Sequence, residues 1–221
     1  NKVHTAFEEG HSIWYFRAFD YVGVDRETGA AQFRNHEGKI VTSSELTDED
    51  MTDIGSAIPK FTYGITLNLE YKGFDFTAFG TGVAGNKIFN ILYRADSPLR
   101  NSLKYYMDNA WTPENKGASM PAVNNVATDL NFWSSSAAMF NGSYFKIKQL
   151  QLGYTLPKRL TQKVAIKDLR FFVSLDDFFT FSNYPGMDPE TATTGNNGGA
   201  GFDIGSYPTM KKCSFGASFS F

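Results

Sequence analysis

The most regular hydrophobic pattern in the chain runs from Phe61 to Tyr71. Its odd positions are apolar or aromatic and its even positions are polar or glycine, without a break over eleven residues. A β-strand places alternate side chains on opposite faces, so the pattern predicts a strand with one apolar and one polar face. The strand is longer than the usual about five or six residues and matches the roughly nine to eleven that cross a bilayer at a tilt.

The same alternation returns after a short turn at Lys72–Gly73, which predicts a hairpin whose second arm begins at Phe74. Further strands are predicted over Tyr144–Tyr154, Leu169–Phe179 and Cys213–Phe221. The phase of the first of these slips near Lys148–Gln149. A β-bulge, or an upper half covered by protein, would explain the slip.

Long connections without a lasting period separate these strands. Residues 84–142 and 180–208 are rich in Gly, Asn, Ser and Pro, whereas the 155–168 connection holds Pro157 and several basic residues. Outer-membrane barrels have short turns at one end and long loops at the other, and this alternation of short and long connections fits that rule. We therefore expect residues 61–221 to supply barrel strands, with long extracellular loops at 84–142 and 180–208.

Residues 1–60 are expected to form a structured loop region with strand pieces, also extracellular. They begin with aromatic residues and become polar, and their alternation is poor. Thr47–Asp50 has capping-box spacing, which predicts a short helix that ends near Gly55.

Composition supports a β-rich fold. The 221 residues include 21 Phe, 11 Tyr, 3 Trp and 20 Gly, and aromatic residues are enriched in strands. The net charge of −2 argues against a nucleic-acid-binding protein. No run of apolar residues is long enough for a transmembrane helix, but a mean hydropathy of −0.31 does not exclude a membrane, because a barrel strand averages its two faces. The single cysteine, Cys213, excludes an intrachain disulfide.

No motif predicts an enzyme or a cofactor. The histidines His4, His11 and His36 have no metal-ligand spacing, and no Gly-x-Ser-x-Gly sequence occurs. The glycine-rich run Gly195–Gly201 lacks the Lys-Ser/Thr of a phosphate loop. A cluster of acidic residues could bind Ca²⁺ through its oxygens or could simply form an acidic helix turn, which we favour. Its members are Glu45, Asp48, Glu49, Asp50 and Asp53.

Aromatic residues in the long connections are candidate ligand or partner contacts, since Trp and Tyr are enriched at binding hot spots. The alternative is that they hold the connections together by packing. The candidates are Trp14, Tyr15, Tyr93, Tyr105, Trp111 and Trp133.

Six motifs, in this order, resemble the SusC/RagA family of TonB-dependent outer-membrane transporters of Bacteroidetes. The six motifs are Pro59-Lys60-Phe61-Thr62-Tyr63-Gly64, Tyr71-Lys72-Gly73-Phe74-Asp75, Trp111-Thr112-Pro113-Glu114-Asn115, Tyr144-Phe145-Lys146-Ile147-Lys148, Leu152-Gly153-Tyr154-Thr155-Leu156-Pro157 and Tyr184-Pro185-Gly186-Met187-Asp188-Pro189-Glu190. Each motif is weak alone, and their shared order makes chance unlikely to explain them. The resemblance is strong over residues 59–221 and weaker before them.

The resemblance implies that the chain is the C-terminal portion of a 22-stranded antiparallel transmembrane β-barrel. It further implies TonB-dependent import of a glycan or peptide across the bacterial outer membrane, with a SusD-like lipoprotein as partner. TonB would act through the N-terminal part that this sequence lacks, and Phe215, Phe219 and Phe221 would form a barrel-assembly signal. A passive or structural outer-membrane barrel is the first alternative, and a soluble all-β binding module is the second.

Within this hypothesis the alternation assigns each strand residue to lipid or to the lumen. The side chains expected in lipid are Ile65, Leu67, Leu69, Leu152, Phe171, Val173, Phe215 and Phe219. Those expected in the lumen are Thr66, Asn68, Glu70, Arg170, Ser174 and Ser218. A charge facing the bilayer midplane would cost about 2–4 kcal/mol for Arg or Lys, which favours this assignment over its reverse.

Overall fold

The computed structural model describes residues 4–91, 104–161, 166–192 and 200–221, which form two compact units. We call them the strand unit, made of Lys60–Ala84, Ser143–Ser182 and Pro208–Phe221, and the loop unit, made of Asn1–Pro59, Gly85–Gly142 and Asn183–Tyr207. The segment up to Pro59 and most of the two long connections thus contribute to a single unit. No helix in the described part of the chain is long and apolar enough to span a membrane.

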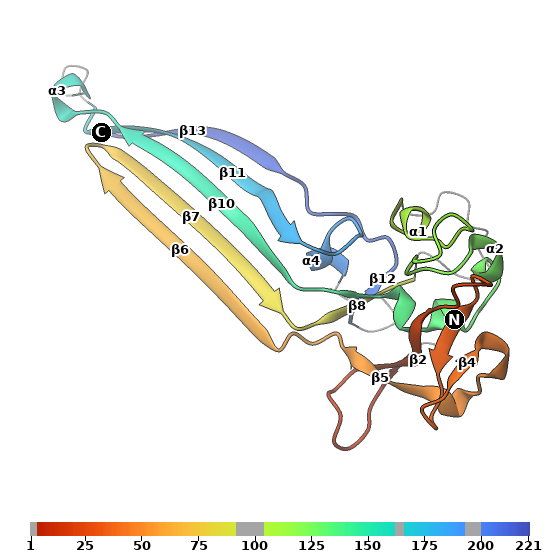
Figure 1. The fold of residues 1–221 in the computed structure, drawn as a ribbon. Helices are drawn as coiled ribbons and strands as arrows, with labels where there is room; N and C mark the ends of the chain where they lie inside the picture. The colour runs from red at the N-terminus through yellow and green to blue at the C-terminus, as the bar shows by residue number, and fades with distance from the viewer. Residues whose placement is uncertain (1–3, 92–103, 162–165, 193–199) are drawn as a thin grey trace. The chain divides into compact units, whose positions relative to one another are not determined.

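The strand unit is a five-stranded antiparallel sheet in the order β13-β11-β10-β7-β6 (Figure 1). Its strands are β6 (Phe61–Tyr71), β7 (Phe74–Ala84), β10 (Tyr144–Thr155), β11 (Asp168–Ser182) and β13 (Lys212–Ser220). The predicted strand at 61–71 is confirmed over its whole length. The three other predicted strands are also present, as β10, β11 and β13, with ends within three residues of the predicted ones. The helical turn α3 (Lys158–Thr161) lies in the connection from β10 to β11.

The predicted turn at Lys72–Gly73 is also confirmed. Lys72 has φ 48° and Gly73 has φ 87°, so both residues adopt the left-handed conformation that a type I′ hairpin turn requires. Glycine accepts this conformation without a steric cost. The turn therefore sets the register of β6 against β7, in which Tyr71 pairs with Phe74 and Phe61 with Ala84.

Pairing across the sheet places the two predicted sets of residues on opposite faces. Leu69, Phe76, Leu152, Val173 and Phe215 stand in one row of directly paired positions. The adjacent row consists of Asn68, Thr77, Gln151, Ser174 and Ser214. Directly paired residues share a face, so one face of the sheet is apolar and the other is polar.

The slip in β10 is a β-bulge. Its register against both β7 and β11 shifts between Ile147 and Gln149. The extra residue, Lys148, returns Phe145 and Ile147 to the apolar face, where they pair with Gly82 and Gly80 of β7. Apolar side chains therefore stand at odd positions before the bulge and at even positions after it, but all of them lie on the same face of the sheet.

An ion pair crosses the polar face beside the hairpin turn. Arg170 of β11 donates from Nε to Asp75 Oδ2 at 2.8 Å, and its Nη2 donates to the other carboxylate oxygen. The two residues belong to strands that flank β10, and Gly153 of β10 pairs with Asp75 between them. A Cβ at position 153 would overlap both charged groups, so glycine is required for this contact.

The loop unit is built around β2 (Tyr15–Val24), which pairs with three other strands. Its sheet also contains β1 (His4–Ala6), β3 (Ala31–Arg34), β4 (Ile40–Thr42) and β5 (Met51–Ser56). A second sheet has the order β12-β8-β9, with β8 (Lys87–Asn90), β9 (Met139–Asn141) and β12 (Phe202–Asp203). The α-helices of the unit are α1 (Lys104–Asp108), α2 (Val123–Val126) and α4 (Pro189–Ala192). The 3₁₀ turns are Ser43–Glu45, Asp48–Asp50, Phe132–Ser134 and Ser136–Ala138.

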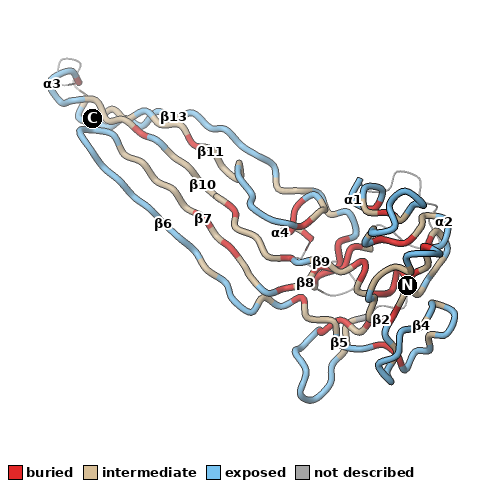
Figure 2. The backbone as a smooth tube through the Cα atoms, in the orientation of Figure 1, coloured by how far each residue is buried: buried red, intermediate tan, exposed pale blue. Residues whose placement is uncertain are grey.

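Poor alternation over residues 13–22 concealed β2, a continuous strand of ten residues. The first half of β2 is buried on both faces, which removes the polar face that alternation requires. Phe16 and Ala18 pack with Phe89 and Phe202, while Phe19 packs in a separate cluster with Phe33 and Trp133. Figure 2 shows this buried backbone in β2 and β8.

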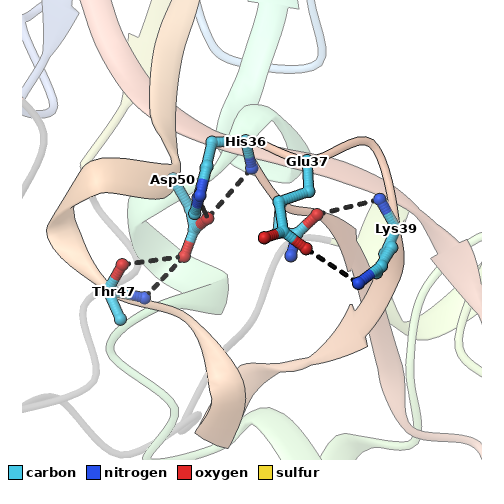
Figure 3. Close-up of polar contacts among 6 residues, drawn as sticks. His36, Glu37, Lys39, Thr47 and Asp50 are labelled. Atoms are coloured by element: carbon cyan, nitrogen blue, oxygen red, sulfur yellow. Dashed lines mark hydrogen bonds and ion pairs between the residues drawn. The ribbon is translucent and has the colours of Figure 1, made fainter.

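The predicted capping box is confirmed, but the helix after it is a single 3₁₀ turn at Asp48–Asp50 that does not reach Gly55. Met51 ends the turn because it pairs with Phe19 as the first residue of β5. Asp50 is buried and accepts hydrogen bonds from the Thr47 N–H, the Thr47 hydroxyl and the His36 N–H at 2.7, 3.0 and 2.9 Å (Figure 3). His36 Nδ1 lies 2.6 Å from Asp50 Oδ1.

These contacts shift two pKa values in opposite directions. Hydrogen bonds from Thr47 and His36 hold the pKa of Asp50 far below its ordinary value, and the hydrogen bond to Asp50 raises the pKa of His36. Stabilisation by charged His36 is complete below the ordinary pKa of 6.5 and is lost as the pH rises through the raised value. Stabilisation by the Asp50 carboxylate is present above its ordinary pKa of 3.8 and is lost as the pH falls through the depressed value.

Replacing Asp50 with Asn should return the pKa of His36 toward its ordinary value. The variant removes the carboxylate that stabilises the imidazolium and keeps the side-chain size. Exchange of the imidazole C2 hydrogen, followed by mass spectrometry on the full-length protein, measures this pKa directly. Asp25→Asn, which removes a carboxylate from another turn of the same unit, is the control. An unchanged His36 pKa in Asp50→Asn would contradict the assigned contact.

Replacing Gly153 with Ala should destabilise the strand unit by about 1–3 kcal/mol, because the new methyl group displaces a partner of the Asp75–Arg170 pair. Gly64→Ala is a matched control on β6, since a Cβ there lies no closer than 3.7 Å to any neighbour. Its effect should stay within about 0.5 kcal/mol. The two variants are compared by the temperature at which the folded full-length protein loses its heat-modifiable migration in gels. Equal transition temperatures for both variants would refute the role of Gly153.

Candidate functional site

The polar face of the strand unit is a candidate surface for binding a solute. Near the hairpin turn it borders an open cavity of about 800 Å³. The polar side chains around this cavity are Asn68, Glu70, Lys72, Asp75, Thr77, Gln151, Thr155 and Arg170. Asp75 and Arg170 neutralise each other, and Thr77 donates to Asn68 at 3.0 Å. The surface therefore offers hydrogen-bond donors and acceptors with little net charge, which suits an uncharged polar solute.

The apolar face carries aromatic side chains toward both ends of its strands. At one end, the rings of Phe61, Tyr63, Phe145 and Phe181 stand in a row, with neighbouring centroids 5.6, 5.9 and 6.4 Å apart. Gly82 leaves room for the Tyr63 ring, and Gly80 leaves room for the Phe145 ring. The other end has Phe74 and Tyr154, whose centroids are 4.5 Å apart, with Tyr71 and Phe171 beside them in the register.

An aliphatic band lies between these two aromatic groups. Ile65, Leu67 and Leu69 of β6 are about half exposed, as is Leu152 of β10. In a soluble domain a continuous apolar face of this kind would have to be covered. Aromatic groups that flank an apolar band are typical of strands that face lipid.

The last three phenylalanines of the sequence also lie exposed. Phe215 and Phe219 are on the apolar face of β13, where they pair with Val173 and Leu169. Phe221 follows the end of β13, and its ring contacts that of Phe219 at 5.6 Å. These positions agree with the predicted apolar side of the final strand.

The structure separates the candidate aromatic contacts into buried and accessible residues. Trp133 is 2% exposed and donates from Nε1 to the Val126 carbonyl, and Tyr15 is 3% exposed and donates to Glu8. Both are core residues, which favours the packing role for these two side chains. Trp14 and Tyr105 remain partly exposed, whereas half-buried Trp111 lies against Gly29 and donates to the Arg26 carbonyl. Tyr93 lies outside the described residues.

Phe7 and Ile13, which were missed from the sequence, form an exposed apolar tip with Trp14 between β1 and β2. Phe7 is 69% exposed and Ile13 60%, and the Phe7 ring contacts that of Trp14 at 6.3 Å. Trp14 has φ 55°, a conformation that residues other than glycine seldom adopt. Single apolar residues in an irregular segment give no periodic signal, so only their exposure distinguishes them.

The acidic cluster is divided among separate contacts. Glu45 accepts from Thr42, Asp50 from Thr47 and His36, and Asp53 lies 2.9 Å from His11 Nδ1. Among the described residues, no group of three or more His, Cys, Asp or Glu side chains is arranged to hold a metal ion. Two other segments were considered in the sequence analysis, His4 as a metal ligand and Gly195–Gly201 as a phosphate loop. His4 lies in β1, and most of the Gly195–Gly201 run is outside the described residues.

The motif at 184–190 has a structural basis in the loop unit. Buried Tyr184 donates to Asp203 and accepts from Asn90 at 3.1 Å, and burial raises its pKa. Gly186 is needed because a Cβ there would overlap the Tyr184 ring. Asp188 accepts from the Glu190 N–H at 3.0 Å and so caps the start of α4. These residues serve packing and turn formation within the unit.

Comparison with known proteins relates the chain to bacterial TonB-dependent receptors. It is 30% identical over 236 residues to TonB-dependent receptor P3 of Formosa agariphila, which covers 96% of this chain and 22% of that protein. It is 25% identical over 199 residues to TonB-dependent receptor P26 of the same organism, covering 87% of this chain and 20% of that protein. The chain thus spans about a fifth of the length of these relatives. No protein-family model matches it.

Solved structures share the fold. The RagAB peptide transporter matches with a TM-score of 0.75 and 23% identity, over 100% of this chain and 25% of that one. The RagAB peptide importer in its closed-closed state matches with a TM-score of 0.74, also at 23% identity and over the same shares. These relatives are receptors and transporters, not enzymes.

The predicted all-β architecture is confirmed, since the strand unit is an open antiparallel sheet and these structural neighbours are barrel transporters. The sequence relatives confirm the resemblance to TonB-dependent receptors predicted from the motifs, and the chain is related to a part of these receptors and shares its fold with the RagAB transporter.

Proposed function

We propose that this chain forms part of the wall and loops of a TonB-dependent importer in the bacterial outer membrane. The observation that carries the proposal is the two-faced sheet of the strand unit. Its apolar face, with an aliphatic band between two aromatic groups, would contact lipid. Its polar face, with the cavity beside Asp75 and Arg170, would line the lumen.

The sheet requires further strands in this setting. Each edge strand pairs on one side only among the described strands, β6 with β7 and β13 with β11. In a bilayer, each unpaired backbone N–H or C=O costs several kcal/mol, so both edges must be covered. Strands from the rest of the protein would supply this pairing and close the barrel.

The proposed topology follows from the lengths of the connections. The Lys72–Gly73 turn and the 155–168 connection would face the periplasm, and residues 84–142 and 180–208 would be extracellular. The loop unit would then stand on the extracellular side, where long connections commonly carry function.

The proposed substrate is an oligosaccharide or a peptide. RagAB, which shares this fold, is described as a peptide importer. The polar face near the hairpin turn presents amide, hydroxyl and carboxylate groups, which can hydrogen-bond either class of solute.

Two protein partners complete the proposal. A SusD-like lipoprotein would dock on the loop unit, and TonB would act through a part of the protein that this chain does not include. The accessible apolar residues Phe7, Ile13, Trp14 and Tyr105 are the proposed lipoprotein contacts. Phe215, Phe219 and Phe221 are the proposed residues for recognition during barrel assembly.

Uptake that depends on the proton gradient tests the function. Cells that carry the full-length gene should take up labelled oligopeptides or oligosaccharides, and both a gene deletion and a protonophore should abolish uptake. A passive barrel would lose uptake on deletion and keep it in the protonophore, which would contradict active import.

The apolar tip tests the proposed lipoprotein contact. Replacing Phe7 and Trp14 together with Ala should weaken co-purification of the lipoprotein at least tenfold, because hot-spot residues contribute about 2 kcal/mol or more each. Ile40→Ala is the control, since Ile40 is 53% exposed in the same unit. Equal co-purification of both variants would move the interface away from this tip.

A further inference from the structure

A cluster of exposed cations lies at the turn end of the strand unit. We call Lys72, Lys158, Arg159 and Lys167 the turn-end cations. Lys72 is in the hairpin turn, two of the others are on α3, and Lys167 directly precedes β11. These segments lie together at the end of the strands where the hairpin turn is (Figure 1). Two hydrogen bonds join them there, from the Thr155 N–H to the Gly73 carbonyl at 2.7 Å and from the Lys167 N–H to the Ser220 carbonyl at 2.8 Å.

These cations have no acidic partners within the described part of the chain. No ion pair joins any of them to a carboxylate there, whereas Lys39 is paired with Glu37 and Lys116 with Glu27. Lys72 Nζ instead lies 5.0 Å from the ring centroid of Tyr71. Because ion pairing elsewhere in the chain is common, four unpaired cations at one end form a surface with unused positive charge.

The carboxylate side chains at the same end are fewer than the cations. Asp75 is engaged by Arg170, and Asp168 accepts a hydrogen bond from the Ser220 hydroxyl at 3.4 Å. Glu70 lies on the polar face, beside the cavity. Among the described side chains of this end, the four turn-end cations and Arg170 outnumber these three carboxylates, so the end carries a net positive charge.

Exposed apolar side chains adjoin the cations. Tyr71 is 69% exposed and Phe74 49% on either side of the hairpin turn, Leu160 is 51% exposed on α3, and Phe219 is 62% exposed on β13. Aromatic side chains next to Lys and Arg are typical of the level at which a protein meets lipid headgroups.

We propose that the turn-end cations bind the phosphate groups of anionic phospholipids in the leaflet at this end of the barrel. The inference rests on the proposed function, because it requires the apolar face to lie in the outer membrane with this end toward the periplasm. The ring face of Tyr71 and the side chain of Leu160 lie against acyl chains, while the ammonium and guanidinium groups reach the headgroups. Each cation contributes roughly fivefold to the affinity at low salt, and salt weakens the binding.

The test uses full-length protein purified from outer membranes and exchanged into vesicles of phosphatidylethanolamine with or without phosphatidylglycerol. Native mass spectrometry then counts the phosphatidylglycerol molecules that stay bound. A variant with all four turn-end cations replaced by Gln should lose most of this lipid. A second variant, in which each Lys is replaced by Arg and Arg159 by Lys, should keep it. The control replaces four exposed, paired cations of the chain with Gln, namely Arg34, Lys39, Lys104 and Lys116.

Each outcome has a defined meaning. Equal phosphatidylglycerol retention in the Gln variant and the control overturns the inference. So does retention of lipopolysaccharide in place of phosphatidylglycerol by the wild-type protein, since that lipid belongs to the other leaflet. Normal uptake by the Gln variant with unchanged lipid binding would refute this inference alone, whereas recovery of the protein outside the membrane fraction would refute the proposed function.

Discussion

The register of the five strands in the strand unit determines the rest of its chemistry. Direct pairing keeps Leu69, Leu152, Val173 and Phe215 in one row and the polar residues in the next, so a shift of one residue in any strand would exchange its faces. The type I′ turn at Lys72–Gly73 sets one register, and the bulge at Lys148 corrects another. One apolar face and one polar face follow from these local features.

Glycine allows polar and aromatic side chains to cross this sheet. Gly153 admits the contact between Asp75 and Arg170 over the intervening strand, and Gly80 and Gly82 admit the rings of Phe145 and Tyr63. On the polar face, the Phe172 ring covers Gly216 and also lies 5.1 Å from the Arg170 guanidinium. Glycines that would weaken an isolated strand thus fix large side chains in place, which explains why Leu152-Gly153-Tyr154 could act as a recognisable motif.

Sequence patterns predicted the strand unit well and the loop unit poorly, for a physical reason. A sheet with one apolar and one polar face leaves a period of two, which marked β6 along its whole length. The first half of β2 is buried on both faces and leaves no such period, and its partner β5 follows in the sequence only after β3 and β4. Burial also decides the roles of single aromatic residues, since nothing in the sequence separates buried Trp133 from accessible Trp14. Family motifs supplied what periodicity could not, namely the relationship to TonB-dependent receptors.

The central claim is that odd positions of β6 face lipid and even positions face an aqueous lumen. A spin label placed in turn at residues 61–71 of the full-length protein in bilayers measures this through collisions with oxygen, which concentrates in lipid, and with a water-soluble nickel chelate. The account predicts a period of two, with oxygen accessibility highest at Ile65, Leu67 and Leu69 and nickel accessibility highest at Thr66, Asn68 and Glu70. The opposite phase, or uniform accessibility to nickel along the strand, would contradict it.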